Sequence, residues 1–163
     1  MKSNNVPSDD FTLDGNWKYQ PSDLGLQVGR YFTLDELIHS DTADRLGIDN
    51  TPTSEAVQCI GGLVTNVLDR LRGEWGRPII VTSGYRCKEL NAAVGGARNS
   101  QHLKGQAADI VSGDFDEFRR FVRRWCKDNE FDQCIFEHGA GREWIHISYV
   151  EGWNRRQVLD LNV

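Results

Sequence analysis

A ten-residue segment, 100–109, places two metal-binding side chains on either side of a glycine. His102 precedes Asp109 by seven positions, and Gly105 lies between them. Because glycine adopts backbone conformations that other residues avoid, the chain can reverse sharply at this point. It can then return as a strand over 106–111, so that both side chains reach one spot. The fold must therefore direct Asp109 on this strand toward His102.

A second segment alternates apolar and polar positions, as in a half-buried strand. Ile145 and Ile147 flank His146, so one face of this strand packs on the core and the other carries the histidine. If this strand neighbours that of Asp109, the two polar residues become cross-strand partners close enough to share an ion. Two imidazoles and one carboxylate are a common ligand set for catalytic zinc. We therefore expect one zinc ion at His102, Asp109 and His146.

Catalysis at such an ion also needs a general base. Zinc lowers the pKa of a water bound to it to about 7, so that hydroxide is available near neutral pH. Glu143, three residues before His146, is the candidate for the base beside that water. In a regular strand this odd offset places Glu143 on the opposite face from His146. Glu143 can serve only if it precedes the strand proper, which Gly139 and Gly141 just upstream permit.

The two segments resemble the signature of the zinc D-Ala-D-Ala carboxypeptidase family of murein metallopeptidases. That signature reads Ser-x-His-x-x-Gly-x-Ala-x-Asp and then Glu-x-x-His, and the likeness covers about residues 31–150. The family includes vancomycin-resistance dipeptidases and phage murein endopeptidases. The resemblance implies the three zinc ligands named above and Glu143 as catalytic acid and base. A further match, Ser-Gly-Tyr-Arg over 83–86, implies that Arg86 binds substrate and stabilises the oxyanion, and Ser100 is implied to contact substrate.

The resemblance implies a zinc-dependent peptidase that hydrolyses peptidoglycan stem peptides by attack of zinc-bound hydroxide. Two activities stay open. An exopeptidase would remove a terminal D-Ala, with Arg86 gripping the free carboxylate, and an endopeptidase such as a phage lysin would cut within the stem or cross-bridge. A non-catalytic zinc-containing binding module is the alternative from another class. Arg86 and Glu143 weigh against that alternative, because a structural zinc site needs neither.

Helical patterns come first along the chain and strand patterns later, which predicts a single α+β domain. We expect a small, mostly antiparallel sheet with helices packed on it and the zinc site on the sheet. A polar N-terminal arm over 1–29 precedes the zinc peptidase domain over 30–163. The clearest helix, 54–72, has apolar residues at helical spacing and is expected to end at Gly73 and Gly76. The other expected elements are helices over 34–39, 42–46, 86–94 and 115–127 and strands over 78–83, 106–111, 133–136, 144–149 and 158–161.

Composition excludes two classes of partner. The formal net charge of −5 argues against a nucleic-acid binder, which needs a basic surface to displace counterions from phosphates. No apolar run approaches the ~18 residues that a membrane span requires. No signal peptide is visible in residues 1–10, so we expect synthesis in the cytoplasm. Action on the cell wall would then require release through a holin-like route. We also expect the protein to be a monomer.

Other residues have ordinary structural explanations. Without a CxxC pair, the four cysteines are expected to be free thiols in a reducing cytosol, or two disulfides if the chain is secreted. His138 belongs to a surface loop or to the wall of a cleft, and His39 ends a helix. The basic cluster is expected to be a solvated helix face rather than an anion site, and it consists of Arg119, Arg120, Arg123 and Arg124.

Overall fold

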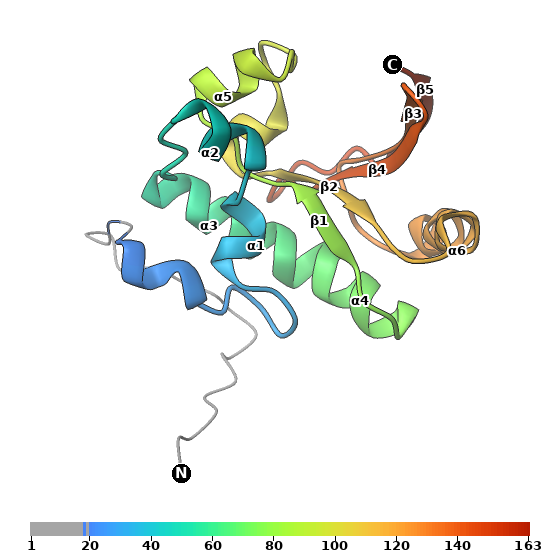
Figure 1. The fold of residues 1–163 in the computed structure, drawn as a ribbon. Helices are drawn as coiled ribbons and strands as arrows, with labels where there is room; N and C mark the ends of the chain where they lie inside the picture. The colour runs from blue at the N-terminus through green and yellow to red at the C-terminus, as the bar shows by residue number, and fades with distance from the viewer. Residues whose placement is uncertain (1–17, 19) are drawn as a thin grey trace.

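The structure, a computed structural model, describes residue 18 and residues 20–163 (Figure 1). The chain folds into helices and a five-stranded sheet, which confirms the predicted α+β class. The helices are η1 (Pro21–Gly25), α1 (Leu34–Ile38), α2 (Asp41–Leu46), α3 (Ser54–Leu63), η2 (Val64–Leu68), α4 (Asp69–Trp75), α5 (Lys88–Ala93), η3 (Gln101–Lys104) and α6 (Phe115–Asp128). The strands are β1 (Ile80–Ser83), β2 (Ala107–Val111), β3 (Gln133–Gly139), β4 (Arg142–Ser148) and β5 (Gln157–Asn162).

The strands lie in the order β1-β2-β4-β3-β5. The pairings of β1 with β2, β2 with β4 and β3 with β4 are antiparallel, and only β5 runs parallel to its neighbour β3. The sheet is therefore mostly antiparallel, as predicted. Its central strand is β4, and β4 and its neighbour β2 carry two of the candidate metal ligands, His146 and Asp109.

The helix predicted over 54–72 is longer than expected and changes its pitch midway. It consists of α3, the π-helical segment η2 and α4, and it ends at Gly76 rather than at Gly73. Gly76 adopts φ +73, and its backbone N–H donates to the carbonyl of Arg72. A glycine in the left-handed region closes a helix because it carries no Cβ to clash. Gly73 lies inside the last turn of α4, which continues to Trp75.

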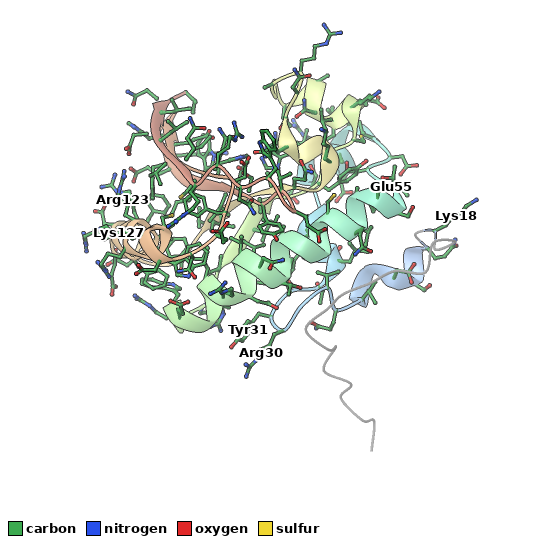
Figure 2. All side chains as sticks on the ribbon, turned by 180° about the vertical axis from the view of Figure 1, so that it is seen from behind. Lys18, Arg30, Tyr31, Glu55, Arg123 and Lys127 are labelled. Carbon is green, nitrogen blue, oxygen red and sulfur yellow. The ribbon has the colours of Figure 1, made fainter. Side chains whose placement is uncertain are left out.

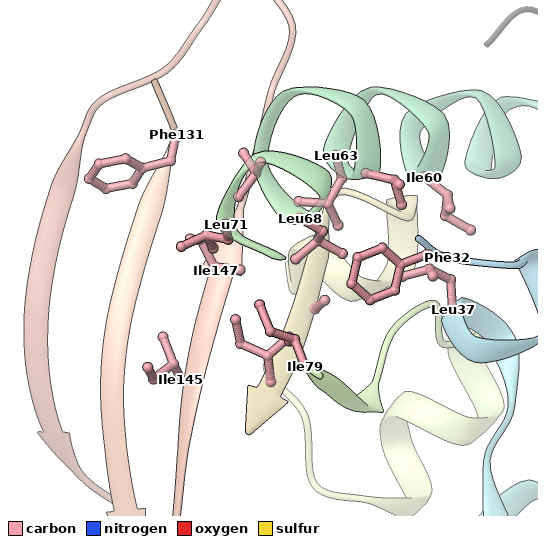
Figure 3. Packing of buried hydrophobic residues seen from close by; sticks show 14 of the residues in the cluster. Phe32, Leu37, Ile60, Leu63, Leu68, Leu71, Ile79, Phe131, Ile145 and Ile147 are labelled. Carbon is pink, nitrogen blue, oxygen red and sulfur yellow. The ribbon is translucent and has the colours of Figure 1, made fainter. Parts of the chain in front are cut away.

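The core lies between this long helix, α6 and one face of the sheet. Ile145 and Ile147 of β4 are fully buried, as are Leu68 and Leu71 of the long helix. Figure 3 shows these side chains gathered between the strands and the helix. Because side chains alternate along a strand, burying both isoleucines turns His146 to the opposite face. Packing of the core thus sets which face of β4 carries the site.

Most of the polar arm predicted over 1–29 lies outside the described residues. The end of that segment nevertheless packs on the domain, since Val28 is fully buried in the core. The Asp69 carboxylate accepts the backbone N–H groups of Arg30 (2.6 Å) and Tyr31 (3.1 Å), and these residues lie beside the long helix in Figure 2. A Cβ on Gly29 would lie 2.5 Å from the Asp69 carboxylate, so this approach requires glycine. The packed domain therefore begins before residue 30.

Within the described part of the chain, no helix has both the length and the apolar character that crossing a bilayer requires.

Candidate metal centre

Asp109 and His146 are paired across neighbouring strands, as the alternation of apolar residues predicted. In the antiparallel ladder of β2 and β4, Asp109 lies opposite His146 and Ala107 lies opposite Ser148. Directly opposed residues project from the same face of a sheet. The two candidate ligands therefore stand side by side on the face that does not pack on the core.

His102 reaches this face from η3, a short 3-10 helix that sequence reasoning did not find. Gly105 ends η3 in the left-handed conformation, with φ +71, and the chain then returns as β2. The predicted reversal at Gly105 is thus confirmed. A Cβ on Gly105 would lie only 2.4 Å from the backbone oxygen of Ala56, so the turn is also pressed against α3.

The three predicted ligands converge on one point. Asp109 Oδ1 lies 3.2 Å from His102 Nε2 and 3.1 Å from His146 Nδ1. One donor atom from each residue lies within 4.8 Å of the other two. All three residues are buried, with exposed fractions of 3%, 8% and 9% for His102, Asp109 and His146. Two imidazole nitrogens and one carboxylate oxygen at this spacing fit the donor set of a catalytic zinc ion.

Neighbouring groups fix the orientation of the ligands. His102 Nδ1 lies 2.7 Å from the backbone oxygen of Gly84. Since a carbonyl only accepts, Nδ1 is the nitrogen that donates, and the lone pair of Nε2 faces the other ligands. The Arg86 guanidinium donates from Nη2 to Asp109 Oδ2 at 2.9 Å, which leaves Oδ1 directed toward the two histidines. Such outer contacts set both the tautomer and the geometry of metal ligands.

Asp109 is charged in this setting. Burial by itself raises the pKa of the Asp109 carboxyl, but the charges and hydrogen bonds of His102 and His146 outweigh it and hold the pKa well below its usual value. Ion pairing and hydrogen bonding to the charged form are the expected causes of such a shift. The site therefore presents a carboxylate to any bound cation over the whole physiological pH range.

Arg86 and Ser100, the two predicted substrate contacts, both lie at the site. Arg86 donates from Nε to Ser83 Oγ at 2.8 Å besides its contact with Asp109, so two hydrogen bonds fix its guanidinium plane. Ser100 is the N-cap of η3, and its hydroxyl accepts the backbone N–H of His102 at 3.3 Å. Each residue thus supports a ligand in the structure, and contact with substrate stays a prediction for both.

The structure does not bring Glu143 to the metal ligands. Glu143 lies within β4, where it is exposed and opposite His138 of β3. The ladder between these strands runs without a shift from Cys134 to Gly139. Three residues along a regular strand change the face, so Glu143 projects away from the side that carries His146. Glu143 was expected to act as general base only if it preceded the strand, and it lies within the strand instead.

The reason is the tight turn that joins the two strands. Ala140 and Gly141 adopt φ +49 and φ +73, and Gly139 pairs with Arg142 directly behind them. Two central residues with positive φ make the kind of hairpin turn that keeps its strands paired to the end. The strand therefore starts at Arg142, before Glu143, rather than after it.

Sequence reasoning missed another carboxylate, Glu137, which does project from the ligand face. Glu137 pairs with Trp144, two residues before His146, so the three side chains share one face. Burial raises the pKa of the Glu137 carboxyl, as does the negative charge of Asp109, whereas the charges of His146 and Arg86 lower it. The strand predicted over 133–136 ended just before Glu137, so the sequence prediction assigned Glu137 to neither face of the sheet.

The remaining histidines lie away from the ligands. His138 is exposed and projects from the opposite face to His146. His39 follows α1 as its C-cap, and its Nε2 lies 2.8 Å from Asp41 Oδ1. His39, Asp41 and Asp44 could also hold a cation by spacing, but all three are exposed. An exposed acidic group of this kind is common without a metal.

The basic cluster and the cysteines are structural features. Arg119 forms an ion pair with Asp116, and Arg123 forms one with Asp160 of β5, so two members of the cluster have carboxylate partners. The cysteines are free thiols in the structure: Cys59, Cys87, Cys126 and Cys134.

Comparison with known proteins adds two findings. The sequence profile of the Peptidase M15 family matches residues 30–148. The zinc D-Ala-D-Ala carboxypeptidase of Streptomyces albus G is 49% identical to this chain over 37 residues. That alignment covers 23% of this chain and 14% of the carboxypeptidase, so the two proteins are matched over a small part of the relative's length.

Proposed function

This chain belongs to the peptidase M15 family, and from that premise we propose that it hydrolyses D-Ala-containing stem peptides of peptidoglycan with zinc as its cofactor. The convergence of His102 Nε2, Asp109 Oδ1 and His146 Nδ1 is the observation that carries the proposal. A bound zinc ion would polarise the scissile carbonyl and make a water molecule acidic enough to attack near neutral pH. These three residues would hold it.

The chain's own groups prepare the site for that chemistry. The Gly84 carbonyl fixes the tautomer of His102, and Arg86 fixes the rotation of the Asp109 carboxylate. Ligands fixed in this way need little rearrangement when the ion or the substrate arrives. Three protein ligands also leave one of the four usual zinc positions open, which distinguishes a catalytic site from a closed structural one.

Arg86 supports the choice of a substrate with a carboxylate or a developing oxyanion. Its Nε and Nη2 are engaged by Ser83 and Asp109, and a guanidinium carries further N–H donors in the same rigid plane. The matched relative is named as a D-Ala-D-Ala carboxypeptidase. Both points favour a peptide that ends in D-Ala, gripped through its terminal carboxylate.

Digestion of purified peptidoglycan by the zinc-loaded protein tests this proposal, with mass spectrometry of the released fragments. Release of terminal alanine identifies a carboxypeptidase, and new amino termini within stem peptides identify an endopeptidase of the phage-lysin kind. Either activity should vanish with a chelator and return with added zinc. Hydrolysis that persists in chelator would contradict the assignment to a metallopeptidase.

A non-catalytic zinc-containing binding module is the competing function, and the position of Glu143 is the observation that favours it. A zinc site without a nearby base could recognise wall peptides without cutting them. The module predicts that zinc-loaded protein binds stem peptides and leaves several wall types intact. Chelator-sensitive release of any peptide fragment would exclude it.

A further inference from the structure

The register of the sheet places a carboxylate beside the metal ligands on the face that they share. Asp109 flanks His146 on one side, and Ile135 of β3 flanks it on the other. Glu137 is two residues further along β3, so it lies diagonally across from His146 on the same face. Diagonal neighbours in a sheet are about 7–8 Å apart at Cα, within reach of a long side chain.

Glu137 is a neighbour of the metal ligands and not one of them. Among the described residues, the group of donor atoms within 4.8 Å of one another on this face consists of His102, Asp109 and His146 alone. The carboxylate of Glu137 therefore stands outside the ligand group, although the charges of Asp109, His146 and Arg86 act on it. A general base requires this arrangement, because it must contact the water without occupying its place.

The surroundings of Glu137 suit a group that accepts a proton and releases it again. Its side chain is partly buried, whereas Glu143 is exposed. Trp144 lies directly opposite it in the ladder of β3 and β4, and the Trp144 side chain is among the groups that lower the pKa of the carboxyl. Partial burial beside charged ligands is typical of carboxylates that transfer protons in active sites.

We infer that Glu137, rather than Glu143, is the catalytic carboxylate that takes the proton from the attacking water. The inference rests on the proposed function. In the first step, a water O–H bond breaks, its proton passes to Glu137, and the oxygen bonds to the scissile carbonyl carbon while the carbonyl π electrons move onto the carbonyl oxygen. In the second step, the C=O double bond re-forms, the C–N bond breaks, and Glu137 returns the proton to the leaving nitrogen. One amide and one water become one carboxylic acid and one amine, and Glu137 ends unchanged.

Glu137→Gln tests this role with the smallest change of shape. Its hydrolysis rate for a stem peptide should fall about 100- to 10,000-fold, the usual contribution of a positioned base. Its zinc affinity, measured by competition with a chromophoric chelator, should stay within about threefold of the wild type, because Glu137 is no ligand. Glu130→Gln, an exposed position after α6, is the matched control and should keep the wild-type rate and zinc affinity.

Glu143→Gln is the rival variant. A greater loss of activity in Glu143→Gln than in Glu137→Gln would overturn the inference and leave the zinc peptidase standing. A loss of zinc affinity in Glu137→Gln as large as its loss of activity would also overturn it, since Glu137 would then be part of the metal site. If the wild type shows no chelator-sensitive hydrolysis, both the proposed function and this inference fail.

Discussion

Gly105 couples the fold to the metal centre, so replacing it with alanine should damage both. Gly105 ends η3 with φ +71, and its missing side chain is what allows the turn to press on α3. Gly47, the C-cap of α2, has φ +66 and no atom within 4 Å of where its Cβ would be. Gly47→Ala therefore carries the backbone strain alone and is the matched control.

The geometry sets the size of the effect. Placing alanine in the left-handed region costs about 1–2 kcal/mol at either site. At Gly105 the new Cβ would also lie 2.4 Å from the Ala56 oxygen and 3.0 Å from Ile60 Cγ1. Both neighbours are on α3, and backbone cannot move aside cheaply, so overpacking adds about 1–3 kcal/mol at this site. The extra penalty corresponds to a Tm about 2–12 °C lower than that of Gly47→Ala.

Calorimetry of the two variants measures that difference, and a chelator competition measures zinc binding. Relief of the clash must move η3 and hence His102, so Gly105→Ala should weaken zinc binding about 10- to 100-fold, as when a ligand loses its orientation. Gly47→Ala should leave zinc affinity unchanged. Equal Tm values and equal zinc affinities for the two variants would refute this coupling of the turn to the ligand.

Three further predictions concern charges and the ion. Asp132→Asn should cost about 2–3 kcal/mol of unfolding free energy by chemical denaturation, because Asp132 is 1% exposed and its carboxylate accepts hydrogen bonds from the Arg155 guanidinium at 2.6 and 2.8 Å. Asp160→Asn, which removes an exposed ion pair, should cost under about 1 kcal/mol. The Arg155 hydrogen bond lowers the pKa of Asp132, so the stability that the Asp132 carboxylate contributes is full above about pH 4 and is lost as the pH falls. If the difference in unfolding free energy between Asp132→Asn and wild type did not shrink in acid, this explanation would be contradicted. Arg86→Lys should lower kcat/KM for a D-Ala-terminated peptide about 10- to 100-fold in steady-state assays, because lysine lacks the planar fork, and an unchanged value would refute the role of Arg86. Removing zinc should lower the Tm, and zinc at 100 times its Kd should restore about 2.7 kcal/mol, whereas a Tm indifferent to zinc would exclude a folded-state site.

The pairing of Asp109 with His146 could be predicted from the sequence because side chains on a strand alternate with a period of two. Once Ile145 and Ile147 are assigned to the core, the face of His146 follows. The reversal at Gly105 could be predicted for a similar reason, since few residues other than glycine close such a turn. Strong local rules thus predicted that the candidate ligands would lie together.

The position of Glu137 on the ligand face could not be predicted, because it depends on where a hairpin turns. Hairpins of two residues are usually signalled by Asn-Gly or Asp-Gly, and in this chain Ala140 precedes Gly141. Without that signal, the end of β3 was placed three residues too early and the start of β4 two residues too late. Glu137 and Glu143 were thus both placed outside their strands, where the alternation of side chains assigns no face, which explains why Glu143 was favoured and Glu137 overlooked.

The position of zinc itself tests the central claim most directly. Crystals of the zinc-loaded protein should give one anomalous peak at the zinc absorption edge, about 2.0–2.2 Å from His102 Nε2, Asp109 Oδ1 and His146 Nδ1. A peak at the exposed group of His39 and Asp41 instead, or none on the face shared by β2 and β4, would contradict the account.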